Sequence, residues 1–196
     1  MEERGTESCP LYKIVTFGEI GAGKSTLIIK FTSGIIGESN PTEEESYRKQ
    51  IDVDGYPCML DILDAVLVEE RTSYHPRHIR EGDAIILFYS ISSRSSFHRL
   101  SFFRDEIESY KGERTLPVIV VATKNDLCDE RQISVEEGRS FARSLDGTFF
   151  ETSVKNEVNI CDPFIESVRA IRRVKGIELP PISSSSSKKS STCILS

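Results

Sequence analysis

Tryptophan is absent from this chain, histidine occurs three times, and the five cysteines are scattered without a C-x-x-C pair. An odd number of widely spaced cysteines favours a reduced, intracellular chain over a disulfide scaffold. The longest apolar run, 84–91, is too short to span a membrane, and the polar N-terminus lacks the apolar core of a signal peptide. With a net charge of -6 and no basic run with interleaved aromatics, nucleic acid is not an expected ligand.

The chain does contain a gap-free match to the phosphate-loop pattern G-x-x-x-x-G-K-[ST], at residues 18–25. An apolar, strand-like run (11–17) precedes the match and a helical run (26–31) follows it. The alternative, a glycine turn that only links strand to helix, is weaker, because a chance match is expected in about one such sequence in a hundred. The backbone N–H groups of such a turn and the positive end of the following helix would cradle phosphates. Lys24 would then reach the β- and γ-phosphates and the Ser25 hydroxyl would ligate Mg²⁺. The predicted phosphate-binding residues are Gly18, Gly21, Ala22, Gly23, Lys24, Ser25 and Thr26.

The remaining strand signals predict a mostly parallel sheet. Runs 47–53 and 56–63 flank Asp54-Gly55, a strong hairpin signal, whereas 84–91 and 117–122 are continuously apolar, as buried parallel strands are. A short strand is expected at 148–152, and the polar stretches 33–45 and 64–76 are expected to be irregular.

Helix signals alternate with these strands. Apolar residues recur at three- and four-residue spacing over 97–110, Ser134 opens a capping box, and Asp162 is expected to cap a last helix with Pro163 in its first turn. We therefore expect an α/β fold of the P-loop NTPase class. It would contain a six-stranded, mostly parallel sheet with one antiparallel hairpin edge strand and about five helices. Ligands of such sheets bind at the carboxyl ends of the strands.

Two loops at such ends carry signals for a guanine base. Thr123-Lys124-Asn125-Asp126 follows a buried strand, and the Asp126 carboxylate could accept hydrogen bonds from N1–H and the 2-amino group of guanine, a donor pair that adenine lacks. Thr152-Ser153-Val154-Lys155 follows the last strand, and its backbone N–H groups could meet the guanine O6. The predicted base-binding residues are Thr123, Lys124, Asp126, Ser153, Val154 and Lys155.

In this order behind a phosphate loop, the motifs resemble those of the Ras family of small GTPases over residues 11 to about 175, which predicts a small G domain there. TKND resembles the N/T-K-x-D motif, TSVK the S-A-K motif, and Asn40-Pro41-Thr42 the first switch, while 60–64 resembles the strand before the second. The resemblance implies that Thr42 ligates Mg²⁺, senses the γ-phosphate and acts with Lys24 in catalysis, and that Asp64 holds Mg²⁺ through water. It also implies that GTP orders residues 35–46 and 64–76, which then bind effectors and exchange factors.

Three residues depart from the family pattern at positions important for hydrolysis. The second switch of the family reads D-x-x-G-Q, whereas this chain has DAVLV at 64–68, so Val68 replaces the glutamine that orients water. Leu67 replaces the glycine whose N–H meets the γ-phosphate, and Ile20 replaces a small glycine where an activator's arginine finger enters. We predict GTP and GDP binding with Mg²⁺ but impaired intrinsic and activator-stimulated hydrolysis.

Three alternatives follow from these departures, and they leave open whether the protein is a working enzyme. It is a slow GTP hydrolase acting as a switch, a persistently GTP-loaded binding module, or a pseudo-GTPase scaffold that neither binds nor switches with nucleotide. The intact Lys24, Ser25 and Asp126 argue against the scaffold, whereas Leu67 and Val68 argue against the switch.

The expected domain organisation is a disordered lead (1–10), a G domain (11–175) and a flexible tail (176–196). The tail is rich in serine and ends in Cys193-Ile194-Leu195-Ser196, the C-a-a-X form recognised by a farnesyl prenyltransferase. A chance cysteine at this position is the alternative. Because only Lys188-Lys189 supports a single lipid on Cys193, we expect reversible attachment to the cytoplasmic face of membranes, the plasma membrane foremost, with exchange into the cytosol.

Overall fold

The computed structural model describes residues 9–36, 45–65 and 75–179. The predictions for Thr42, Leu67, Val68 and Cys193, and for most of both terminal segments, lie outside these ranges. Within the described ranges the chain alternates between strands and helices in the following order: β1 (Leu11–Gly18), α1 (Lys24–Ser33), β2 (Glu45–Val53), β3 (Tyr56–Asp64), α2 (His75–Glu81), β4 (Ala84–Ser90), α3 (Arg94–Tyr110), β5 (Val118–Thr123), a 3-10 turn (Cys128–Glu130), α4 (Val135–Arg143), β6 (Thr148–Glu151) and α5 (Asp162–Val174).

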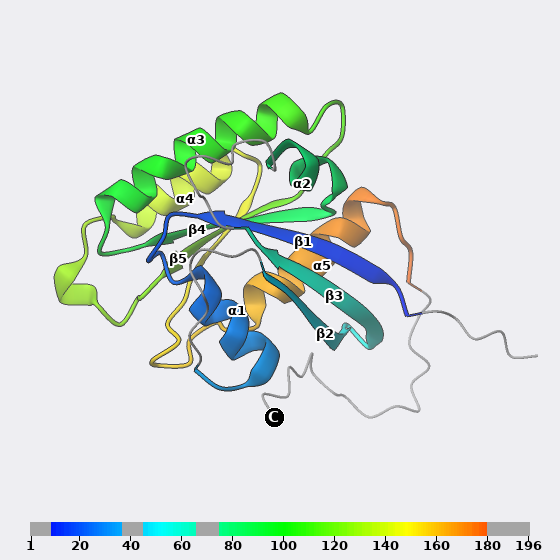
Figure 1. Ribbon diagram of the computed structural model, residues 1–196, viewed down its shortest axis with the longest axis horizontal. Helices are drawn as coiled ribbons and strands as arrows, with labels where there is room; N and C mark the ends of the chain where they lie inside the picture. The colour runs from blue at the N-terminus through cyan, green and yellow to red at the C-terminus, as the bar shows by residue number, and fades with distance from the viewer. Residues whose placement is uncertain (1–8, 37–44, 66–74, 180–196) are drawn as a thin grey trace, which may run out of the picture.

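The six strands form one sheet in the order β2-β3-β1-β4-β5-β6. The β2–β3 pair is antiparallel and joined at Asp54-Gly55, whereas the other four pairings are parallel. Helices α1 and α5 cover one face of the sheet, and α2, α3 and α4 cover the other (Figure 1). This confirms the predicted α/β P-loop architecture, with β2 as the antiparallel edge strand.

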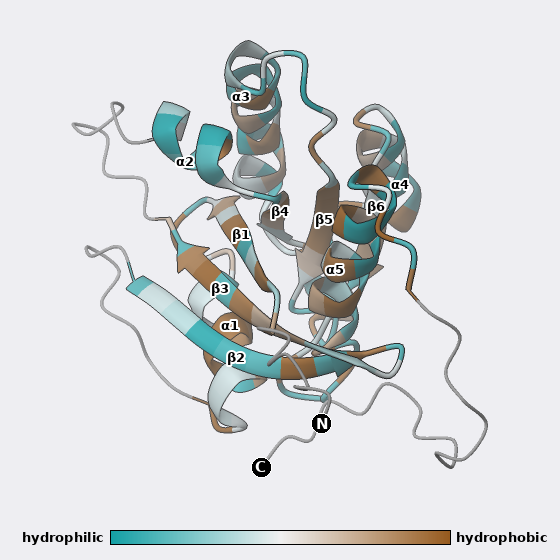
Figure 2. Ribbon diagram, turned by 90° about the vertical axis from the view of Figure 1, so that its right-hand side faces the viewer, coloured by the Kyte–Doolittle hydropathy of each residue, from teal (hydrophilic) through white to brown (hydrophobic). Residues whose placement is uncertain are grey.

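Two apolar clusters hold the layers together, one on each face of the sheet. On the α1/α5 face, Phe31 stacks on Phe164 with ring centroids 4.0 Å apart. On the other face, Phe17 of β1 stacks on Phe103 of α3 at 5.4 Å. Strands β4 and β5 are buried along their whole length, because helices cover both of their faces (Figure 2).

Helix α4 begins as the sequence indicates. The Ser134 side chain accepts the Glu137 N–H, and the Glu137 carboxylate accepts the Ser134 N–H. This is the reciprocal capping box, which satisfies two backbone donors that the helix leaves unpaired.

Two details of the helices differ from the prediction. Asp162 is the first residue of α5 rather than its cap, because the half-helical capping position is Cys161, and Pro163 then occupies the second helical position. Helix α2 was not predicted: residues 64–76 were expected to be irregular, and no helix signal was found over 75–81. Pro76 occupies the second position of this helix, where its missing N–H costs no helical hydrogen bond. Among the described helices, none is both long enough and apolar enough to cross a bilayer.

Candidate functional site

The phosphate loop, residues 18–23, lies at the carboxyl end of β1 and leads into α1. A Cβ at Gly18 would lie 2.6 Å from the Phe88 carbonyl oxygen, so the loop can approach β4 only with glycine at this position. Gly23 has φ +80° and caps α1 without a side-chain hydrogen bond. The first N–H groups of α1 therefore remain available to an anionic ligand, which the helix dipole also attracts.

Lys24 and Ser25, the first two residues of α1, both contact Asp64 at the end of β3. The Lys24 Nζ lies 3.4 Å from Asp64 Oδ1, and the Ser25 hydroxyl donates to Asp64 Oδ2. Lys24 is 6% exposed and Asp64 2% exposed. The sheet thus brings two predicted phosphate-loop residues and the predicted second-switch carboxylate into one buried cluster.

This cluster fits a magnesium ion bound with phosphate. Asp64 Oδ1 is buried, faces the Lys24 ammonium at 3.4 Å and accepts no hydrogen bond from the described residues, so this oxygen keeps acceptor capacity for a further ligand. In the described part of the chain, no group of three or more His, Cys, Asp and Glu side chains could hold a metal by itself. Mg²⁺ needs no such group, because it commonly takes one or two protein oxygens and completes its shell with water and phosphate. The third predicted ligand, Thr42, lies outside the described residues.

A pocket of about 330 Å³ adjoins the phosphate loop and unites the two predicted base motifs with it. Its lining comes from the start of α1, the segment after α1, the end of β5 and the loop after β6: Gly23, Thr26, Ile36, Thr123, Lys124, Asp126, Thr152, Val154 and Lys155. Seven of these nine residues were predicted as ligand-binding residues. Thr152 was named only as the first residue of the second base motif, and Ile36 was missed because an isolated isoleucine after a helix carries no signal for a base site.

The Asp126 carboxylate is fixed by its neighbour from the second base motif. The Ser153 hydroxyl donates to Asp126 Oδ1 at 2.6 Å, and this hydrogen bond holds the pKa of Asp126 below its usual value. An ionised carboxylate with a defined position can accept two hydrogen bonds from a base edge, as guanine recognition requires.

Thr123 connects the base motif to the phosphate loop. Its hydroxyl donates to the Ala22 carbonyl oxygen at 2.5 Å and lies 3.1 Å from the carbonyl of Tyr89. The side chain is buried, so these bonds are shielded from water. The position of β5 therefore helps to set the shape of the phosphate loop.

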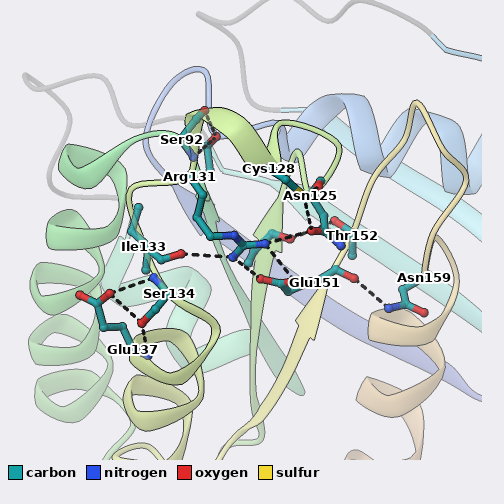
Figure 3. Close-up of polar contacts among 12 residues, drawn as sticks. Ser92, Asn125, Cys128, Arg131, Ile133, Ser134, Glu137, Glu151, Thr152 and Asn159 are labelled. Carbon is teal, nitrogen blue, oxygen red and sulfur yellow. Dashed lines mark hydrogen bonds and ion pairs between the residues drawn. The ribbon is translucent and has the colours of Figure 1, made fainter.

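A second polar network, which the sequence did not reveal, holds the loop after β5 that contains Asn125 and Asp126, here called the base loop (Figure 3). The Arg131 guanidinium makes two contacts to the Glu151 carboxylate, at 2.6 and 3.2 Å, and donates to Asn125 Oδ1 at 3.0 Å. The bond to Glu151 raises the pKa of the Arg131 guanidinium. Asn159 donates to the Glu151 carbonyl at 2.8 Å, and the Cys128 thiol donates to the Asn125 carbonyl at 2.9 Å. Arg131 thus ties the loop after β5 to β6.

One departure from the family pattern also falls within the described residues. Ile20 lies in the turn between β1 and α1, and the residue is 61% exposed. An aliphatic side chain of this size occupies solvent space at the phosphate loop. The other two departures, Leu67 and Val68, lie outside the described residues.

The Ras family model matches residues 13–173, which include every helix and strand described above except the first two residues of β1 and the last residue of α5. Proteins of this family bind guanine nucleotide together with Mg²⁺, and they bind regulators and effectors. The match covers most of the chain and agrees with the sheet order and the pocket described above. This chain belongs to the Ras family of small GTPases.

Proposed function

We propose that this protein is a guanine-nucleotide-binding signalling protein that holds GTP or GDP with Mg²⁺ and hydrolyses GTP poorly. The observation that carries the proposal is that one pocket is lined both by the phosphate-loop residue Gly23 and by Asp126, the residue predicted to select guanine. Gly23 and Asp126 are far apart in the sequence. The sheet brings them together, because β1 lies beside β4 and β4 lies beside β5.

Each end of the nucleotide has its own set of residues. The α1 N-terminus and the Lys24 ammonium would hold the phosphates, Asp126 would select the base, and Ser25 with Asp64 would hold the metal. When bound, Mg²⁺ supplies neutralisation of the charge on the β- and γ-phosphate oxygens. Lys24 Nζ lies 3.4 Å from Asp64 Oδ1, so the ammonium stands beside the carboxylate that would hold the metal.

The impaired hydrolysis rests on the residues that should position the attacking water. Val68 has an alkyl side chain that neither donates nor accepts a hydrogen bond, and Leu67 lacks the φ freedom of glycine. The exposed Ile20 side chain fills space that an activator's arginine would need, and that arginine contributes about 10³ to 10⁵ in rate. Loss of water positioning and of the arginine site affects the chemical step more than nucleotide binding.

The first experiment identifies the nucleotide that the purified protein retains. Protein prepared without added nucleotide is denatured, and the supernatant is analysed by chromatography. Bound GTP supports a persistently loaded module. Bound GDP indicates that hydrolysis survives. An empty site favours the pseudo-GTPase scaffold, because Leu67 replaces the glycine whose N–H would meet the γ-phosphate.

Single-turnover hydrolysis then tests the role of the second switch. We expect the wild-type rate to lie at least tenfold below the roughly 4 × 10⁻⁴ s⁻¹ of an intrinsic small GTPase. The pair of substitutions Leu67→Gly and Val68→Gln should raise it toward that value, whereas Val68→Leu should leave it unchanged. A wild-type rate at the family value would refute impaired hydrolysis.

We also propose that Cys193 carries a farnesyl group that tethers the protein reversibly to the cytoplasmic face of membranes. The support is the C-a-a-X sequence behind a serine-rich segment with two lysines, each worth about 1 kcal/mol at an anionic leaflet. The test compares the intact mass and the membrane fraction of the protein with those of a Cys193→Ser variant, both made in eukaryotic cells. An unmodified wild-type mass would contradict this proposal.

A further inference from the structure

Lys30 in α1 is a charged side chain that is almost completely buried. Its residue is 8% exposed, and its Nζ donates to the Gly34 carbonyl oxygen at 2.9 Å and to the Glu157 carboxylate at 2.7 Å. A buried ammonium is tolerated only where its hydrogen bonds are satisfied, so these contacts fix the side chain in place.

The first contact holds the segment that leaves α1. Gly34 caps this helix with φ +77°, and its N–H donates to the carbonyl of Lys30 at 3.0 Å. Lys30 therefore binds both the N–H and the C=O of Gly34, one through its backbone and the other through its side chain. Two residues further on, Ile36 lines the pocket that contains Asp126. By holding Gly34, Lys30 helps to position the segment that carries Ile36 to the pocket.

The second contact holds the loop on the other side of the pocket. Glu157 lies in a tight turn that two backbone hydrogen bonds between Ser153 and Val158 close, at 3.1 and 2.9 Å. Within this turn Val154 and Lys155 line the pocket, while Ser153 holds Asp126. Because the turn is short and closed, a displacement of Glu157 displaces the base-binding residues with it.

We propose that Lys30 is a positioning residue that clamps these two sides of the base pocket together and slows release of the nucleotide. This inference rests on the proposed function, since it assumes that guanine nucleotide occupies the pocket. A nucleotide leaves when the sides separate, and the Lys30–Glu157 bond must break before they do. The clamp therefore acts on the dissociation rate more than on the association rate, as most affinity differences between related complexes do.

The chemistry of the pair also limits how strong the clamp can be. The Lys30 side chain is 11% exposed but the Glu157 carboxylate is 61% exposed, so water screens one partner. Bonding to Lys30 still holds the pKa of Glu157 below its usual value. We therefore expect loss of this pair to change the rate of nucleotide dissociation by about threefold to tenfold, which is measurable without abolishing binding.

The test measures release of a fluorescent methylanthraniloyl GDP from full-length protein in Mg²⁺ buffer, after addition of excess unlabelled GDP. Lys30→Met keeps the side chain as far as Cε but removes the ammonium, and Glu157→Gln removes the charge of the partner. We expect each variant to release nucleotide about threefold to tenfold faster, with association rates within about twofold of wild type. The double variant should be no faster than the faster single variant, because both changes act on the same ion pair.

The matched control is Lys175→Met. Lys175 also bonds a carboxylate at 2.7 Å, that of Asp83, but this pair lies at the amino end of β4, away from the carboxyl ends where the pocket lies. Its release rate should equal that of wild type. If Lys30→Met fails to fold, the release rate of Glu157→Gln is compared with that of wild type, since the Glu157 side chain lies at the surface and its substitution should not prevent folding.

The outcomes separate this inference from the proposed function. Wild-type release rates in Lys30→Met and Glu157→Gln, or additive effects in the double variant, overturn the clamp and leave nucleotide binding intact. Equal acceleration of association and dissociation also overturns it, since that pattern indicates a general loosening of the pocket. A wild-type protein that retains no guanine nucleotide overturns the proposed function, and the clamp with it.

Discussion

Arg131 provides the most direct test of how the base loop is held. The substitution Arg131→Met removes the guanidinium while keeping most of the aliphatic stem. It breaks both contacts to Glu151 and the bonds to the Asn125 side chain and the Ile133 carbonyl, the latter at 3.2 Å. Glu151 then keeps its charge in a position where its side chain is only 17% exposed.

The size of the effect follows from this partial burial. Exposed ion pairs contribute about 0.2–1 kcal/mol, and breaking a fully buried pair costs about 3–5 kcal/mol. The Arg131 and Glu151 side chains, at 23% and 17% exposure, lie between these limits and have two-contact geometry. We therefore expect Arg131→Met to lower the free energy of unfolding by about 2 kcal/mol, and the coupling in an Arg131/Glu151 double-mutant cycle to be about 1–2 kcal/mol.

The assay is urea unfolding at one saturating GDP concentration, because bound ligand contributes to the measured stability. Arg143→Met is the matched control: Arg143 pairs with Glu136, but these side chains are 66% and 67% exposed. The control should change the free energy of unfolding by less than about 0.5 kcal/mol. If Arg131→Met costs no more than the control, or if the cycle gives no coupling, Arg131 does not support the base loop.

Three further substitutions test other parts of the structure. Asp126→Asn should weaken GDP binding about 10²- to 10³-fold and favour xanthosine diphosphate, which presents a carbonyl in place of the 2-amino group; unchanged base selectivity would contradict guanine readout by Asp126. Tyr89→Phe should raise the free energy of unfolding by about 1 kcal/mol, because the buried Tyr89 hydroxyl has no hydrogen-bond partner among the described residues; a loss of stability in urea would refute this reasoning. Bonds from Arg94 and Ser134 lower the pKa of Glu137 from 4.5 to about 2. The contribution of Glu137 to the free energy of unfolding is therefore complete above pH 4.5 and is lost as the pH falls toward 2. Glu137→Gln should reduce the change of the urea unfolding midpoint with pH between 4.5 and 2. A pH profile like that of wild type would show that Glu137 does not contribute to stability in this range.

Local sequence signals were sufficient where one short segment contains the whole physical reason. The phosphate loop was predicted because its glycines, Lys24 and Ser25 are contiguous, and the structure places them at the start of α1. The Ser134 capping box was predicted for the same reason, since its partners are three residues apart. Helix α2 was missed because it is only seven residues long and lacks an apolar repeat, so a local pattern does not distinguish it from a loop.

Sequence by itself therefore determined the family motifs and, through them, the prediction of guanine nucleotide and Mg²⁺ as ligands, since phosphate, metal and base preferences are properties of residue types within short motifs. Tertiary structure decided how those motifs are joined and held. Asp64 contacts Ser25 across 39 residues, Arg131 reaches Glu151 across 20, and Lys30 reaches Glu157 across 127. Periodicity and spacing in the sequence do not predict such pairs. Each pair depends on the order of the strands in the sheet and on which charged side chains become buried.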